Sequence, residues 1–124
     1  MTRAALLLFA LLALSPLRAS DPWTKADTAR ELAFTAVVVL DWGTTLDIER
    51  AHQESPWIHE TNPILGRHPS RAKVNLYIPA GILLHFLAAR AMPARWRAAF
   101  QSASIFIEAG AVSHNFAVGL RLNF

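Results

Sequence analysis

Three long apolar segments, at 32–48, 74–92 and 98–120, constrain the fold most, because each is close to the length of a membrane-spanning helix. Apolar residues make up 53% of the chain and charged residues 17%, which also favours a membrane protein. The sequence therefore predicts an all-α membrane protein with about three transmembrane helices. The predicted domain covers residues 20–124, with helices at about 30–48, 72–92 and 96–120.

The N-terminal segment has the layout of a secretory signal peptide. Arg3 precedes the apolar run AALLLFALLAL, which is followed by Pro16 and by the small residues Ala19 and Ser20. The run is shorter than the ~20 residues that a spanning helix needs. We expect a signal peptide at 1–19 and a location in the bacterial inner membrane, with a retained N-terminal anchor as the alternative.

The polar residues inside the apolar segments follow helical spacing. Asp41 and Thr45 share one face of the first predicted helix, and Glu108 and Asn115 share one face of the third. His85 interrupts the second segment. An ionisable residue inside a spanning helix costs about 2.5–3.5 kcal/mol, so such residues usually face partners within a bundle. We therefore expect Asp41, His85 and Glu108 to converge near the middle of the membrane.

Two carboxylates and an imidazole allow several interpretations. Asp41, His85 and Glu108 could fix helix packing through interhelical hydrogen bonds, which is the interpretation that the sequence favours. They could also relay protons or bind an ion, or act as catalytic acids and bases. These three residues are the catalytic candidates, and the sequence indicates no cofactor.

The segment HETNPILGRHPS, residues 59–70, is a polar connection between two apolar segments. Asn62 precedes Pro63 and is disfavoured in helical geometry, whereas Gly66 can adopt a positive φ. Ser70 is a suitable N-cap for the next helix. The sequence therefore predicts a compact loop built from turns.

Several residues near this loop could ligate a metal. The histidines at 52, 59, 68 and 114, together with Glu60, have the required side-chain chemistry. Their spacing matches no standard ligand template, so His59, Glu60 and His114 are only weak metal candidates.

Several stretches resemble a group of small uncharacterised bacterial membrane proteins: LDWGTTLDI, ETNPILGRHPS, KVNLYI, HFLAA, FIEAG and HNFAVGL. The recurring pattern of that group is an Asp-x-x-Thr-Thr helix followed by a Glu-x-Asn-Pro-x-Leu-Gly loop, and the similarity covers about 40–124. The matching positions are Asp41, Thr45, Glu60, Asn62, Pro63 and Gly66. The resemblance implies a signal peptide and about three helices, and no known activity. It favours a role for Glu60 and Asn62 beyond that of a spacer.

The C-terminal stretch FAVGLRLNF supports an alternative fold. Its strict alternation ends in Phe124 and resembles the closing strand of an outer-membrane β-barrel. A barrel needs at least eight alternating strands, and 74–92 and 98–118 are nearly continuous apolar runs instead. The helical bundle is therefore the main prediction.

The charge and its distribution limit the classes of binding partner that we expect. The formal net charge of +3 is spread over single Lys and Arg residues, which argues against nucleic-acid binding. The basic residues divide evenly between the two predicted sides of the membrane, so charge does not predict the orientation. The expected partners are the lipid bilayer and either a second copy of the chain or another membrane protein. The sequence favours an interaction or assembly role over an enzyme.

Overall fold

The computed structural model describes residues 21–124, and this part of the chain is all-helical with no strand. Its elements are α2 (Lys25–Thr45), α3 (Ile48–Glu54), α4 (Arg71–Ala91) and α5 (Ala94–Ala117). The predicted signal peptide at 1–19 lies outside the described residues. The prediction of an all-α fold is confirmed for residues 21–124.

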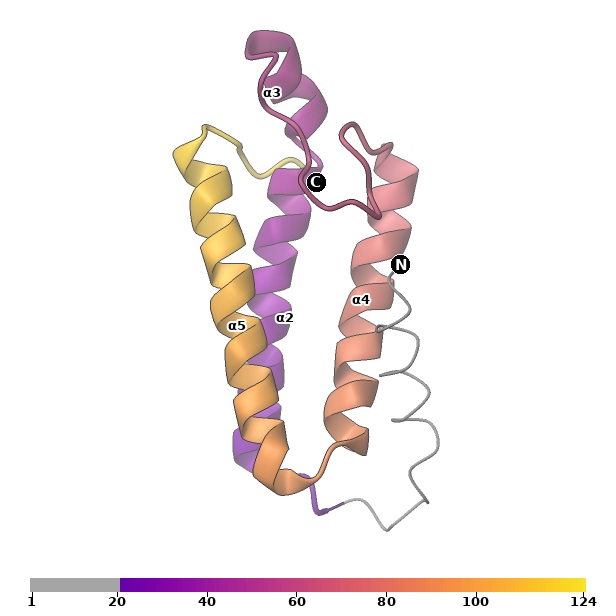
Figure 1. Cartoon of the computed structure of the whole chain (residues 1–124), viewed down its shortest axis with the longest axis vertical. Coiled ribbons are helices and arrows are strands. Elements are labelled where there is room, and N and C mark those ends of the chain that lie inside the picture. Colours follow the sequence, from indigo (N-terminus) through magenta and orange to yellow (C-terminus); the bar gives the residue numbers. More distant parts are fainter. Residues whose placement is uncertain (1–20) are drawn as a thin grey trace.

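The three long helices form an up-and-down bundle. Figure 1 shows α2 and α5 running side by side in the same direction, with α4 running in the opposite direction. A short turn at 92–93 joins α4 to α5 at one end of the bundle. The opposite end carries α3, the loop at 55–70 and the C-terminal tail, and it is called the loop end from here on. The closest packing is between α2 and α5.

Local sequence signals explain where the helices begin. The Thr24 side chain accepts a hydrogen bond from the Asp27 N–H, and the Asp27 carboxylate accepts one from the Thr24 N–H, which forms a capping box. Ser70 caps α4 by accepting a hydrogen bond from the Lys73 N–H. Gly119, with a φ of 91°, reverses the chain after α5.

The observed boundaries differ from the predicted ones in two places. The predicted first helix begins at residue 30, whereas α2 begins at Lys25 because the cap at Thr24 starts it earlier. The predicted connection at 49–73 contains α3, a short polar helix. The predicted alternation at the C-terminus does not form a strand, and the tail instead packs beside the junction of α2 and α3 (Figure 1).

The C-terminal tail is attached to this junction by backbone and side-chain hydrogen bonds. The buried Asp47 carboxylate accepts hydrogen bonds from Arg50 and from the N–H of Arg121, at 2.8 Å. The N–H of Asn123 donates to the carbonyl of Gly43 at 3.0 Å. The hydrogen bonds from Arg50, followed by the N–H of Arg121, hold the pKa of Asp47 below its usual range. The ionised Asp47 therefore joins α2, α3 and the tail.

Membrane-crossing potential differs among the helices. Among residues 21–124, α4 is the one helix that is both long and apolar enough to cross a bilayer, judged by length and composition. Helices α2 and α5 are as long but more polar, since they contain residues such as Glu31 and Gln101. Length and composition by themselves thus support one of the three predicted spans.

Arg97 is fully buried and joins four parts of the described chain. Its guanidinium has five N–H donors, and each of them has an acceptor within 3.1 Å. The acceptors are the carboxylate of Asp27 and the carbonyls of Asp21, Pro22, Ala89 and Met92. Arg97 therefore ties the start of α5 to α2, to the end of α4 and to the segment that precedes α2.

We expect Arg97→Met to lower the free energy of unfolding by about 3 kcal/mol, because it removes the buried partner of the Asp27 carboxylate, leaving only the more exposed Arg30, and removes the donor to four carbonyls. The measurement is apparent thermal stability of the purified protein in detergent. The double variant Arg97→Met with Asp27→Asn should recover part of the loss, since no buried charge is then left unpaired.

Arg95→Met is the matched control, because Arg95 lies two residues before Arg97 on the same helix and is exposed. Its stability should stay close to that of the unchanged protein. Equal losses for Arg95→Met and Arg97→Met would contradict a specific role for the buried guanidinium.

Candidate functional site: a polar cavity between α4 and α5

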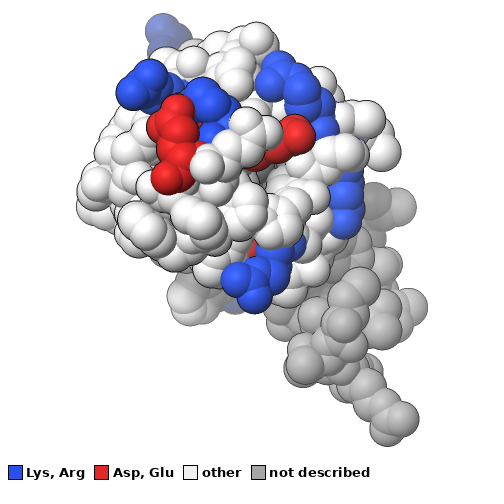
Figure 2. Space-filling view, turned by 90° about the horizontal axis from the view of Figure 1, so that it is seen from above, with Lys and Arg blue, Asp and Glu red and all other residues white. Residues whose placement is uncertain are grey.

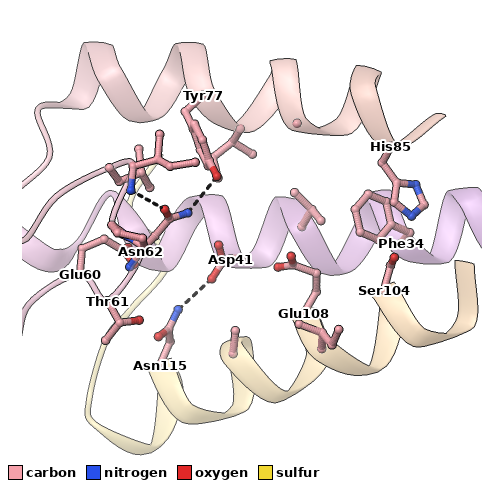
Figure 3. Close-up of a pocket in the computed structure, with 18 residues that line it drawn as sticks. Phe34, Asp41, Glu60, Thr61, Asn62, Tyr77, His85, Ser104, Glu108 and Asn115 are labelled. Atoms are coloured by element: carbon pink, nitrogen blue, oxygen red, sulfur yellow. Dashed lines mark hydrogen bonds between the residues drawn. The ribbon is translucent and has the colours of Figure 1, made fainter. Parts of the chain in front are cut away.

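A cavity of about 670 Å³ lies between α4 and α5, with α2 behind it and the loop at 60–65 at one end. Figure 3 shows its side chains, which come from all three long helices and from the loop. Its lining includes Asp41, Glu60, Asn62, Tyr77, His85, Ser104, Glu108 and Asn115, together with apolar residues such as Phe34 and Ile78. The three catalytic candidates predicted from the sequence therefore line one cavity.

Asp41 is held at the cavity by α5. Its carboxylate accepts a hydrogen bond from the Asn115 amide at 2.9 Å, and the same amide donates to the Thr44 hydroxyl at 2.9 Å. Thr44 is fully buried, and its hydroxyl also donates to the carbonyl of Asp41. Asn115 thus fixes the position of Asp41, which lines the cavity.

Glu108 faces the same space from α5. Figure 3 shows Asp41, Glu108 and Asn115 reaching into the gap between α4 and α5, and it shows no hydrogen bond to Glu108 among the residues drawn. The Glu60 carboxylate accepts a hydrogen bond from the N–H of Asn62 at 2.7 Å. Three carboxylates therefore line the cavity, and no Lys or Arg is among its lining residues.

Asn62 orders the loop at 60–65, which forms one end of the cavity. Its amide donates to the Tyr77 hydroxyl at 3.0 Å, and its side-chain oxygen accepts from the N–H of Ile64 at 2.9 Å. Gly66, at a φ of 81°, completes the turn, and its N–H donates to the Asn62 carbonyl. Asn62 therefore organises the loop and docks it on α4, which gives a physical reason for the Asn-Pro and Gly positions predicted to matter.

His85 closes the other end of the cavity. Its ring lies between Phe34 and Phe100, with centroid distances of 3.6 and 4.6 Å. Its Nδ1 lies 2.9 Å from a carboxylate oxygen of Glu31, and the second Glu31 oxygen accepts from the Gln101 amide at 2.9 Å. The Nε2 atom of His85 is buried and has no partner among the described residues.

The partner of His85 differs from the sequence prediction. Spacing alone suggests that His85 satisfies Asp41 and Glu108, but the imidazole instead contacts Glu31, nearly three turns before Asp41 on α2. The Glu31–His85 pair was missed because Glu31 and Asp41 lie on the same helical stripe. The spacing predicts that Glu31 and Asp41 share a face of α2. It does not predict which turn of α2 lies opposite His85, because that depends on how the helices pack.

The predicted metal candidates lie elsewhere. His59, Glu60 and His114 line a second cavity of about 250 Å³ at the loop end. The rings of His52 and His68 are also neighbours, with centroids 4.3 Å apart. Within residues 21–124, no group of three or more His, Asp or Glu side chains is arranged to hold a metal ion.

The remaining residues that the sequence singled out lie at or near the cavities. Thr45 is buried at the end of α2, beside the Thr44 that contacts Asn115. Pro63 lines the large cavity next to Asn62. Glu60 and Asn115 line both cavities and so separate them.

Comparison with known proteins gives no relative: no family model matches the chain, and no curated protein or solved structure is significantly similar to it. The resemblance to small uncharacterised bacterial membrane proteins stays a prediction. Any functional argument must therefore rest on the chemistry of the site.

We expect Asn62→Ala to loosen the loop at 58–67, because the substitution removes the hydrogen bonds to Tyr77 and Ile64 together. Faster tryptic cleavage after Arg67, or faster amide hydrogen exchange in the loop, would measure this opening. Tyr77→Phe removes only one of the two bonds and should have a smaller effect in the same direction. An unchanged cleavage rate in Asn62→Ala would contradict the role of Asn62 as the organiser of the loop.

Proposed function

We propose that the chain is an integral membrane protein that binds the positively charged group of a small ligand in the cavity between α4 and α5. The observation that carries the proposal is the lining of this cavity, which contains three carboxylates and no Lys or Arg. Such a cavity favours a cation, because opposite charge stabilises the carboxylates away from bulk water.

The distribution of polar and apolar side chains supports the membrane part of the proposal. The two largest fully buried side chains are Arg97 and Gln101. Large apolar side chains are exposed on all three long helices: Leu32, Leu40, Leu76, Leu83, Leu84, Leu87, Phe106, Ile107 and Phe116. Only 17% of the apolar window of α4 is buried, whereas a core helix of a water-soluble protein is mostly buried. A bilayer would cover this apolar surface.

The two ends of the bundle fit a position across a bilayer. Trp96, which is 58% exposed, lies near the turn between α4 and α5, and Trp57, which is 75% exposed, lies at the loop end. Exposed Trp residues favour the two interfaces of a membrane. Figure 2 shows Lys and Arg side chains spread around the loop end, with acidic groups among them, as suits contact with headgroups and water.

His85 adds an acceptor for the ligand. The Glu31 carboxylate requires a proton on Nδ1 of the imidazole, so in the neutral ring Nε2 carries a lone pair. This atom is buried and has no partner among residues 21–124, and His85 is one of the residues that line the cavity. A buried acceptor without a partner is unfavourable, and a ligand N–H would satisfy it. Asp41 and Glu108 thus form the proposed cation site, and Nε2 of His85 is a separate acceptor at the opposite end of the cavity.

An assembly role is the second candidate. The exposed face of α5 carries Ala103, Gly110 and Ala117, which are seven residues apart. A Cβ atom placed on Gly110 would meet nothing within 4 Å, so another helix could approach closely there. A second copy of the chain or another membrane protein is the proposed partner.

The membrane location predicts a clear effect of a charge on the outer face of α4. Leu84 is 53% exposed, so Leu84→Arg would be tolerated in water, but in a bilayer it should cost about 2.5–3.5 kcal/mol. We expect a marked fall in the amount of protein retained in carbonate-washed membranes. Leu122→Arg, at a 48% exposed position in the tail, is the control and should be tolerated. Full retention of Leu84→Arg would contradict the proposed span.

The cation site predicts that butylammonium binds to the protein in lipid nanodiscs and that Asp41→Asn and Glu108→Gln each weaken its binding about tenfold, since each removes a charge-assisted hydrogen bond. Titration calorimetry measures the affinity. Glu54→Gln is the control, because Glu54 lies on α3 outside the cavity lining and is 64% exposed. No binding to the unchanged protein, or equal affinity in all variants, would refute the cation site.

A further inference from the structure

We propose that the ligand of the large cavity is an amphiphile with a cationic, phosphate-free head, which enters sideways from the bilayer through a mouth formed by Gly81 and Ile107. This inference rests on the proposed function, because it assumes that the cavity lies in a membrane and binds a cation. It adds the chemical class of the ligand and its route of entry.

The mouth follows from the residues that both line the cavity and reach the surface. Ile107 on α5 is 72% exposed and Ile64 in the loop is 58% exposed, yet both line the cavity. On α4, Gly81 also lines the cavity, and a Cβ atom placed there would meet nothing within 4 Å. The space beside Gly81 is therefore open, and its rim is apolar.

The surface around this mouth continues as an apolar face. Leu83 and Leu84 on α4 are 56% and 53% exposed, and Phe106 on α5 is 78% exposed. In the proposed membrane these side chains contact acyl chains. A ligand that occupies the acidic interior while its remaining part lies at this rim must combine a cationic head with an apolar chain.

The lining also selects against phosphate. Asp41, Glu60 and Glu108 would repel a phosphate group, and no lining Lys or Arg could neutralise it. A zwitterionic phospholipid places its phosphate next to its ammonium group, so it would bring that phosphate to the carboxylates. A single-chain amine or quaternary ammonium amphiphile avoids this repulsion.

The length of the cavity suits such a ligand. Along α4 the lining runs from Tyr77 to His85, which corresponds to about 12 Å at the rise of an α-helix. Figure 3 shows the acidic pair of Asp41 and Glu108 between these two ends. Gly81 lies midway along this length and Ile107 is next to Glu108, so the chain of a ligand whose ammonium group lies at this pair can leave the cavity past Gly81 and Ile107.

The experiment uses the full protein in lipid nanodiscs and compares dodecylammonium, dodecylphosphocholine and butylammonium as probes. Gly81→Leu places a side chain at the mouth, and its Cβ atom would meet nothing within 4 Å. Gly110→Leu is the matched control, because Gly110 is also a helical glycine with open space but lies outside the cavity lining. Binding is measured against discs that contain Asp41→Asn/Glu108→Gln protein, which removes the contribution of partition into lipid.

We expect dodecylammonium to bind at least about tenfold more tightly than dodecylphosphocholine. Gly81→Leu should weaken dodecylammonium binding about tenfold and leave butylammonium binding unchanged, whereas Gly110→Leu should leave both unchanged. Butylammonium is small enough to lie wholly within the cavity of about 670 Å³, so a side chain at the mouth should not exclude it.

Each contrary result has a distinct meaning. If butylammonium binds and dodecylammonium binds no better in wild-type discs than in Asp41→Asn/Glu108→Gln discs, the cation site stands and the amphiphile inference is wrong. Equal binding of the phosphocholine probe, or a loss in Gly81→Leu no larger than in Gly110→Leu, also overturns the inference. If neither ammonium probe binds, the proposed function itself fails.

Discussion

The buried guanidinium of Arg97 is the constraint on which the rest of the bundle depends. Its five hydrogen bonds join the start of α5 to α2, to the end of α4 and to the segment before α2. These hydrogen bonds fix the axial position of α5 relative to α2, so that Gln101 contacts Glu31 and Asn115 contacts Asp41. The position of the cavity therefore follows from an interaction at the opposite end of the bundle.

The two ends of the bundle use similar polar chemistry with different results. At the turn end, the carboxylate of Asp27 and the guanidinium of Arg97 satisfy each other and exclude solvent. Toward the loop end, Asp41 has an amide partner, but Glu108 faces open space across from α4. A bundle in which the Asp27–Arg97 pair is hydrogen-bonded while Glu108 faces a cavity is better suited to ligand binding than to packing alone.

The sequence predicted the elements better than their contacts. The period of the polar residues was sufficient to place Asp41, His85 and Glu108 on inward faces, because helical spacing is a local property. It could not show that His85 pairs with Glu31, because the partner of His85 depends on the axial position of α4 relative to α2. It also missed α3, a short helix held in place by Asp47 and the tail, and only its alternative prediction, a β-barrel, interpreted the alternation of Leu120, Leu122 and Phe124 as a strand. In the structure, Leu120 is buried near α3, while Leu122 and Phe124 approach Gly43.

The incomplete satisfaction of the cavity is itself the strongest argument for a ligand. In a bilayer, a carboxylate such as Glu108 and a buried acceptor such as Nε2 of His85 both lack the water that would solvate them at an aqueous surface. A shorter residue at position 108 would remove the cost at that position without disturbing the Arg97 interactions, which lie elsewhere in the bundle. The arrangement becomes favourable when a cation occupies the space, since an ammonium group at Asp41 and Glu108 would satisfy these carboxylates. The apolar rim at Gly81 and Ile107 then gives the remainder of that ligand a place in the lipid.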